Sequence, residues 1–287
     1  MTSEAEYRFL FRGSALALGG RIRRPDLPLQ SQAPALVGVS GGVSRNRTTG
    51  AKFGDIVSYA SSDSEVQADY QDPAAAVKFT HGNHAQNRLP TRTIVRTTLA
   101  GLAIINADAT TRRSLTCSKM SAEMVSQWPG LQGQTSFTGI KAGIEGLKLD
   151  TFEVNVAFTA DMFADRDTKG KLKHAYESAE TWRRVYDRFF FRPAGQDIPA
   201  ARMPESGGLT YCTIVSRISW RGTPNPHARI DGHKIVFKDF GTIYFGELFI
   251  SEFSRRLTLM RVELGSPCGG SVDCAELEVD GHGYPPY

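Results

Sequence analysis

The sequence predicts a mainly-β protein, a β-sandwich or open barrel of antiparallel strands with one long amphipathic helix packed on it. Two observations support this fold class: apolar and polar residues alternate in many short segments, and glycine-rich turns separate them. A third is that helical periodicity occurs in one stretch only, whereas a doubly wound fold needs helices between its strands. We expect about ten strands, a single domain over residues 1–264 and a Gly/Pro-rich tail over 265–287.

The composition is that of a globular protein. A chain of 287 residues with 40% hydrophobic content is able to bury a sizeable core. Basic and acidic residues are mixed along the chain and leave a net charge of +4, so nucleic-acid binding is not signalled. No window approaches the roughly 18 apolar residues of a membrane helix, and the N-terminus lacks a basic segment followed by an apolar one. We therefore expect no transmembrane segment and no signal peptide, with a cytoplasmic location or export by a leaderless route.

The first part of the chain predicts strands joined by polar turns. Tyr7, Phe9 and Phe11 alternate with arginines, which predicts an opening strand. Segments 54–59 and 64–70 predict two short strands around a Ser-Ser-Asp turn.

An internal echo occurs in the middle of the chain. A six-residue pattern occurs twice, around Gly101-Leu102 and around Gly146-Leu147. In each copy Gly-Leu stands at the centre and an apolar residue stands at either end. Two such copies predict related strands in equivalent places, such as one in each half of a sandwich. Alternation over 152–158 predicts a further half-buried strand.

One long helix is predicted from about residue 168 to 191. Asp167 or Thr168 can cap its start, and Pro193 ends it. Apolar residues recur at spacings of three and four, which predicts a stripe that lies on a sheet. The stripe consists of Leu172, Ala175, Ala179, Trp182, Val185, Tyr186 and Phe189.

The segment 230–264 contains the densest run of strand-forming residues. Ile235 and Phe237 alternate with lysines and predict a strand with one exposed face. After a glycine turn, segment 243–250 is apolar at almost every position and predicts a central strand. Segment 257–264 then completes a three-strand antiparallel meander.

Two groups of residues are candidate metal ligands. His81 and His84 lie close together in a loop, and neutral histidines are common ligands. Asp161, Asp165 and Asp167 could offer oxygens to a hard cation. The alternatives are a solvated loop for the histidines and, for the aspartates, charges that face the N-terminal dipole of the helix.

Candidate catalytic residues are few. His227, Asp231 and His233 form the best acid–base cluster, because a histidine beside a carboxylate can titrate near neutrality. Ordinary turn polarity is the alternative. Ser40 stands in a G-x-S-x-G pattern, but the polar residues that follow do not predict the helix that a nucleophile elbow requires. Cys268 and Cys274 are either a disulfide in a small loop or free thiols. No cofactor motif is present.

We consider two hypotheses for function. The first is a structural or interaction protein that self-assembles as a homo-oligomer, or docks a protein partner, through sheet edges and terminal segments. The tail, with one possible edge strand over 275–279, would take part in this assembly. The alternative is a β-barrel enzyme or small-molecule-binding protein with a site near the 227–233 turn. The absence of a strong catalytic motif favours the first and leaves enzyme activity open, leaning against it.

Overall fold

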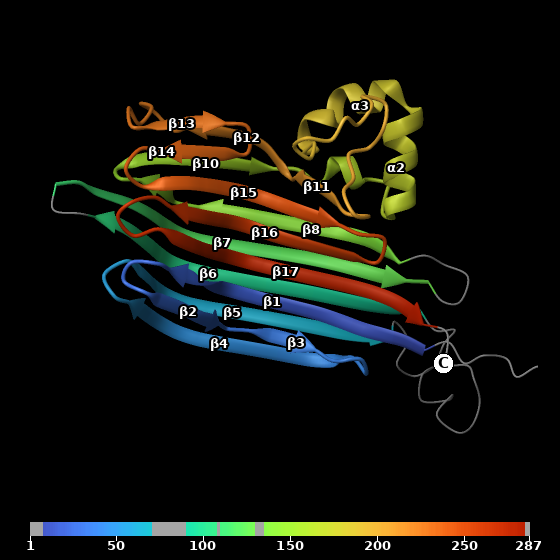
Figure 1. The fold of residues 1–287 in the computed structure, drawn as a ribbon. Coiled ribbons are helices and arrows are strands. Elements are labelled where there is room, and N and C mark those ends of the chain that lie inside the picture. The colour runs from blue at the N-terminus through green and yellow to red at the C-terminus, as the bar shows by residue number, and fades with distance from the viewer. Residues whose placement is uncertain (1–7, 71–89, 108–109, 130–134, 285–287) are drawn as a thin grey trace, which may run out of the picture.

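The computed structural model describes residues 8–70, 90–107, 110–129 and 135–284. Two antiparallel sheets account for most of this part of the chain, and its helices are few and short (Figure 1). The predicted mainly-β class is therefore confirmed. None of the helices among the described residues has the length and apolar character needed to span a bilayer.

Sheet A contains nine strands and is built mainly from the two ends of the chain. Two short strands lie off its main path: β11 (Thr210–Thr213) pairs with β15, and β3 (Ala35–Val37) pairs with β1. The main path runs through β13 (Ala228–Asp231), β14 (Lys234–Phe237), β15 (Gly241–Ile250), β16 (Ser254–Leu264), β17 (Gly270–Tyr284), β1 (Arg8–Ile22) and β2 (Leu27–Gln32).

Sheet B contains eight strands and is built from the middle of the chain. Strand β8 (Ser136–Glu145) lies off its main path and pairs with β7. The main path runs through β12 (Val215–Trp220), β10 (Phe152–Phe158), β9 (Leu147–Leu149), β7 (Arg112–Trp128), β6 (Thr91–Ala107), β5 (Val57–Tyr70) and β4 (Gly42–Phe53).

The two sheets pack against each other through their long strands. Strands β1 and β17 of sheet A lie against β5, β6 and β7 of sheet B (Figure 1). The sheets approach closely at Gly13, where a Cβ atom would lie 2.8 Å from Val66 Cγ1 and 3.1 Å from Val95 Cγ1. Fully buried side chains such as Leu99 and Phe245 come from both sheets. One apolar core between the sheets therefore holds the described strands together.

The two Gly-Leu copies lie where the regular alternation of sheet B is interrupted. Gly101 and Gly146 have φ values of 62–65° and lie opposite Ser118, one on each side of β7. Leu99 and Leu102 are both buried although they are three positions apart, so the strand changes which alternate positions face the core. The expectation of one copy in each half of the fold is wrong, because both copies lie in sheet B.

The predicted single helix over 168–191 is also wrong. The chain forms α2 (Lys169–Ser178), α3 (Glu180–Tyr186) and the short η3 (Asp187–Phe189), with an extended Ala179 between the two helices. Because of this break, Tyr176 and Trp182 are both buried in an edge-to-face contact, with 6.3 Å between the centres of their rings. Tertiary packing thus overrides a continuous helical period. Of the two predicted caps, Thr168 accepts a hydrogen bond from Lys171 N.

The predicted C-terminal tail is a central strand. β17 pairs with β16 on one side and with β1 on the other, and Val272 and Leu277 are fully buried. Its alternation of buried and exposed side chains is interrupted at Ala275, which has a positive φ of 52°, as Gly101 does in β6. The predicted meander corresponds to β14, β15 and β16.

Candidate binding slot beside strand β8

Strands β8 and β10 diverge from a common point. β8 and β9 lie on the same side of β7 and are separated by Gly146. The chain then turns at Asp150, whose carboxylate accepts a hydrogen bond from Ser114 N at 3.0 Å. β10 pairs with β9 at three positions and continues along β12, leaving β8 behind. We call the space between β8 and β10 the β8 slot.

One edge of β8 is free. Within the described residues, β8 pairs with β7 and with no other strand. On the opposite side, Phe137 N donates a hydrogen bond to Asp167 O at 2.8 Å and so closes the far end of the slot. Backbone N–H and C=O groups in a strand point to both sides alternately, so those that face the slot, apart from Phe137 N, pair with no other strand among the described residues.

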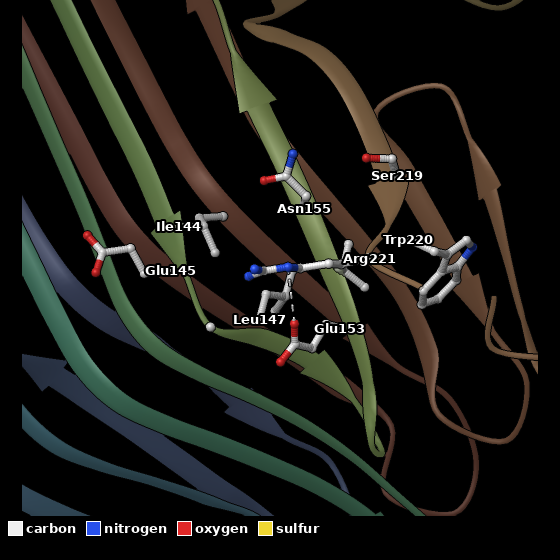
Figure 2. A pocket seen from close by; sticks show the side chains of 10 residues that line it. Ile144, Glu145, Leu147, Glu153, Asn155, Ser219, Trp220 and Arg221 are labelled. Atoms are coloured by element: carbon white, nitrogen blue, oxygen red, sulfur yellow. Dashed lines mark ion pairs between the residues drawn. The ribbon is translucent and has the colours of Figure 1, made fainter. Parts of the chain in front are cut away.

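The narrow end of the slot holds a pocket of about 580 Å³. Ile144, Leu147 and Val154 are apolar residues in its wall, while Glu145, Glu153, Asn155 and Arg221 supply polar groups. Figure 2 shows β8 and β10 diverging and the Arg221 side chain reaching back over β10. Arg221 Nε lies 3.8 Å from Glu153 Oε2, and the arginine side chain is 82% exposed. Apolar walls with a few polar groups are typical of binding sites.

The far end of the slot holds a second pocket of about 310 Å³. Phe137, Ile140 and Phe163 line it together with Asp165 and Asp167. Hollows therefore occur at both ends of β8, on the side of its free edge.

A buried arginine side chain, that of Arg255, contacts Phe137 of the far pocket. The guanidinium carbon of Arg255 is 4.1 Å from the centre of the Phe137 ring, and Arg255 is 2% exposed. Its Nη1 donates to Ser251 O at 2.7 Å, whereas its Nη2 has no partner among the described residues. Burial lowers the pKa of this guanidinium to about 9.

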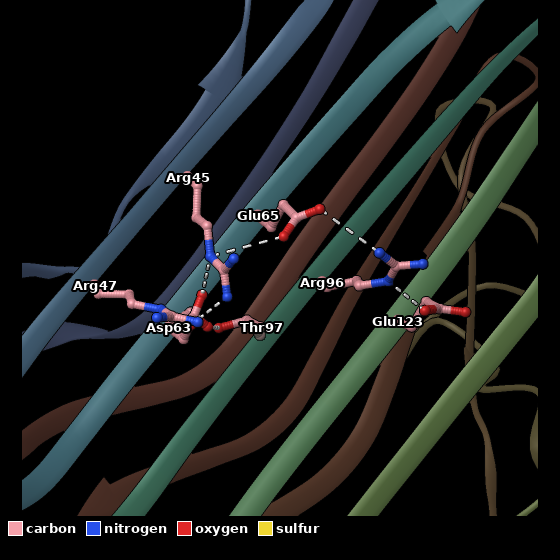
Figure 3. A network of polar contacts seen from close by, with 7 residues as sticks. All are labelled: Arg45, Arg47, Asp63, Glu65, Arg96, Thr97 and Glu123. Atoms are coloured by element: carbon pink, nitrogen blue, oxygen red, sulfur yellow. Dashed lines mark hydrogen bonds and ion pairs between the residues drawn. The ribbon is translucent and has the colours of Figure 1, made fainter.

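A ladder of opposite charges crosses the outer face of sheet B from β4 to β7 (Figure 3) and continues to Lys141 on β8. Arg45, Glu65, Arg96, Glu123 and Lys141 stand directly opposite one another on β4 to β8 in turn. Arg96 Nε lies 2.5 Å from Glu123 Oε2, and Lys141 Nζ lies 2.8 Å from Glu123 Oε1. Opposite charges on neighbouring strands attract, so the ladder supports this register.

A second carboxylate joins the β4 end of the ladder. Asp63 contacts both Arg45 and Arg47, at 2.9 Å for the Arg45 Nη2 atom. The hydrogen bond from Arg45 lowers the pKa of Asp63 below its usual value. Both arginines of the edge strand are thus already paired within the sheet.

The predicted acid–base residues do not form one cluster. His227 precedes β13 and is exposed, and Asp231 at the other end of β13 lies 3.6 Å from Lys234 Nζ. His233 stacks on Phe191 at 4.4 Å between ring centres, and its Nε2 lies 3.9 Å from Glu247 Oε1. A catalytic role for these residues stays a prediction without a shared site.

Glu247 is the charged residue that His233 meets instead. It receives two bonds from Arg261, at 2.7 and 2.9 Å, in a forked arrangement. Burial opposes ionisation of Glu247, but bonds from His233 and Arg261 lower its pKa to about 2. The pair ties β15 to β16 on the outer face of sheet A.

The predicted metal ligands are placed as follows. Asp161 and Asp165 are exposed, and Asp167 lies 2.7 Å from Lys171 Nζ. No group of three His, Cys, Asp or Glu side chains that could hold an ion occurs among the residues that the structure describes. His81 and His84 lie outside the described residues.

The remaining candidates have structural surroundings. Ser40 lies in a turn that leads into strand β4, so the helix of a nucleophile elbow does not follow it. Cys268 and Cys274 are buried free thiols. Sequence reasoning missed the β8 slot, although the glycine of the second Gly-Leu copy stands where β8 and β9 meet.

Comparison with known proteins gives a family and no named relative. A search of the curated proteins and a search of the solved structures both found no match. Residues 9–251 match the family model described as Domain of unknown function (DUF8256). Because this match covers most of the chain, the protein belongs to the DUF8256 family.

Proposed function

We propose that this protein is a structural or interaction protein that docks an extended segment of a partner protein in the β8 slot. In this proposal the two sheets form a β-sandwich scaffold, and the partner segment pairs with the free edge of β8. The single observation that supports it most is that, among the described residues, β8 is hydrogen-bonded to a strand on one side only.

Strand addition explains how such a slot would bind. A segment laid along β8 gains main-chain hydrogen bonds whatever its side chains are, and its alternate side chains enter the pockets at either end. The pockets beside Ile144 and Ile140 can receive those side chains. Backbone pairing would give affinity, and the pockets would give selectivity.

The shape of the slot favours a single segment over the sheet edge of a second copy. β10 and β12 continue sheet B beyond the slot, so they occupy the place that the rest of an incoming sheet would need. A lone extended segment has no sheet behind it. We therefore assign the segment to a partner protein, and homo-oligomer formation becomes an alternative that light scattering of the protein alone tests.

The experiment uses two proline variants of β8 and one peptide. Successive N–H groups of β8 point to opposite sides, so of Ala142→Pro and Gly143→Pro one removes a bond to β7 and the other removes a donor that faces the slot. We expect the variant that loses the bond to β7 to be less stable by about 2 to 3 kcal/mol. The variant that loses only the slot-facing donor should keep the fold.

The probe is a dye-labelled peptide that copies β7 residues 119–126, because β7 already pairs with β8 in the antiparallel direction. Fluorescence anisotropy should show saturable binding to the unaltered protein and loss of binding in the folded proline variant. If the folded variant binds as the unaltered protein does, or if the unaltered protein does not bind, docking on β8 is wrong. A particle mass above that of one chain in the absence of peptide would support the second-copy alternative.

A further inference from the structure

The charge ladder on sheet B is incomplete at the slot. Glu65, Arg96 and Glu123 each contact opposite charges on both neighbouring strands. Lys141, the member on β8, contacts a carboxylate on the β7 side only among the described residues, and its side chain is 79% exposed. Its other side faces the free edge of β8.

Building on the proposed function, we infer that the segment docked in the β8 slot carries an aspartate or glutamate opposite Lys141, with an apolar residue on each side of that acid. The acid would take the place in the ladder that Glu123 takes on β7. The partner is thus an extended segment with an apolar–acidic–apolar core.

The requirement for apolar neighbours follows from the direction of the side chains. Ile140 and Ala142 flank Lys141, and they stand opposite the buried Met124 and Ala122 of β7. They therefore face the interior of the fold while Lys141 faces outward. Residues next to the acid in a docked strand would face the same way, between Ile140 and Ala142 and the residues of β10.

Strand β7 shows that this pattern suits β8. Its residues Ala122, Glu123 and Met124 have the apolar–acidic–apolar order, and they pair with Ala142, Lys141 and Ile140. A strand on the free edge would meet the same outward charge and the same inward neighbours.

The size of the expected effect comes from cross-strand charge pairs. An opposite pair is favourable and a like pair unfavourable by comparable amounts, and together they change affinity by about five-fold. The charge opposite Lys141 would therefore select among segments, while backbone pairing provides most of the binding.

The test combines two peptides with two forms of the protein. The first peptide copies residues 119–126, KMSAEMVS, and the second replaces its glutamate by lysine, KMSAKMVS. The protein forms are the unaltered chain and Lys141→Glu, an exposed substitution that places a like charge opposite Glu123 and should leave the circular dichroism spectrum unchanged and lower the melting temperature only slightly.

We expect the unaltered protein to bind the acidic peptide about five-fold more tightly than the basic one, and Lys141→Glu to reverse this order. Equal affinities for both peptides in both protein forms, with slowed hydrogen exchange in β8, would overturn this inference and leave docking on β8 intact. Absence of binding by either peptide, or binding that leaves β8 exchange unchanged, would overturn the proposed function as well.

Discussion

Strands β4 and β8 each have one edge that pairs with no strand in the part of the chain that the structure describes, yet these edges differ in what they face. β4 is 12 residues long and ends the sheet, and it carries Arg45 and Arg47, which are 48% and 65% exposed. β8 has a free edge inside the sheet, facing β10 across the slot, and carries charges of both signs at Lys141 and Glu145.

The two edges differ in how they would meet another strand. Two copies of β4 side by side would bring arginines near arginines, and charged edge residues are a common protection against unwanted pairing. The charges of β8 are of both signs, so they repel a second strand less than two arginines do, but β10 and β12 keep whole sheets away from it. In the proposed function, the slot admits single segments, while the charges on β4 and the position of β10 and β12 oppose edge-to-edge pairing within sheet B.

The largest expected effect concerns the point where the slot begins. Gly146 has a φ of 62°, and a Cβ atom there would lie 2.2 Å from Ser118 Oγ. We expect Gly146→Ala to lower the free energy of unfolding by about 2 to 4 kcal/mol, because it adds backbone strain and a clash. Gly143→Ala is the matched control in β8, since the nearest atom would lie 3.6 Å away. Urea unfolding measures the free energy of unfolding of both variants. A loss for Gly143→Ala as large as that for Gly146→Ala would contradict this expectation.

The next effect separates charges that hold the fold from charges that select a partner. The pKa of Glu247 is about 2 in the folded protein, below the unfolded value of about 4.3, so its stabilisation is present above pH 4.3 and is lost as pH falls toward 2. We expect Glu247→Gln to remove about 2 kcal/mol of this acid-dependent stability. Glu65→Gln in the exposed ladder should change it by less than about 1 kcal/mol. Equal effects in urea titrations at pH 7 and pH 3 would mean that the ladder also holds the fold.

A smaller effect tests the protection of β4. The double variant Arg45→Thr/Arg47→Thr removes like charges from an edge strand, and we expect it to self-associate at about two- to five-fold lower concentration. Lys141→Thr should leave association unchanged because β10 and β12 block the approach of a second sheet to β8. Light scattering over a concentration series provides the measurement, and a stronger effect from the β8 substitution would reverse the comparison.

Alternation predicted those parts of the fold where it is regular. The meander at β14, β15 and β16 has clear alternating or continuous apolar runs, and it forms as expected. Only residues 275–279 of strand β17 were predicted as a strand, and as an edge strand, because the positive φ of Ala275 shifts which positions face the core: Cys274 and Leu277 are both buried. A search for a strict period of two does not find such a strand.

The candidate site lay beyond sequence patterns for a different reason. The slot exists because β10 leaves β9 for β12, and that choice depends on contacts between distant segments. The Gly-Leu echo did carry a signal at Gly146, but a glycine of positive φ does not reveal which strands separate beside it. The break at Ala179 is similar, since packing of Tyr176 on Trp182 decides it.

Residue-resolved hydrogen exchange tests whether β8 has a free edge able to accept a strand. In the free protein, the slot-facing amides of β8 beyond Phe137 should exchange rapidly and the others slowly, while amides of β7 over residues 119–127, where both sides are paired, should exchange slowly. Adding the KMSAEMVS peptide should slow the rapid set in β8 and leave β4 unchanged. Uniformly slow exchange along β8 in the free protein, or protection of β4 in place of β8, would contradict the account.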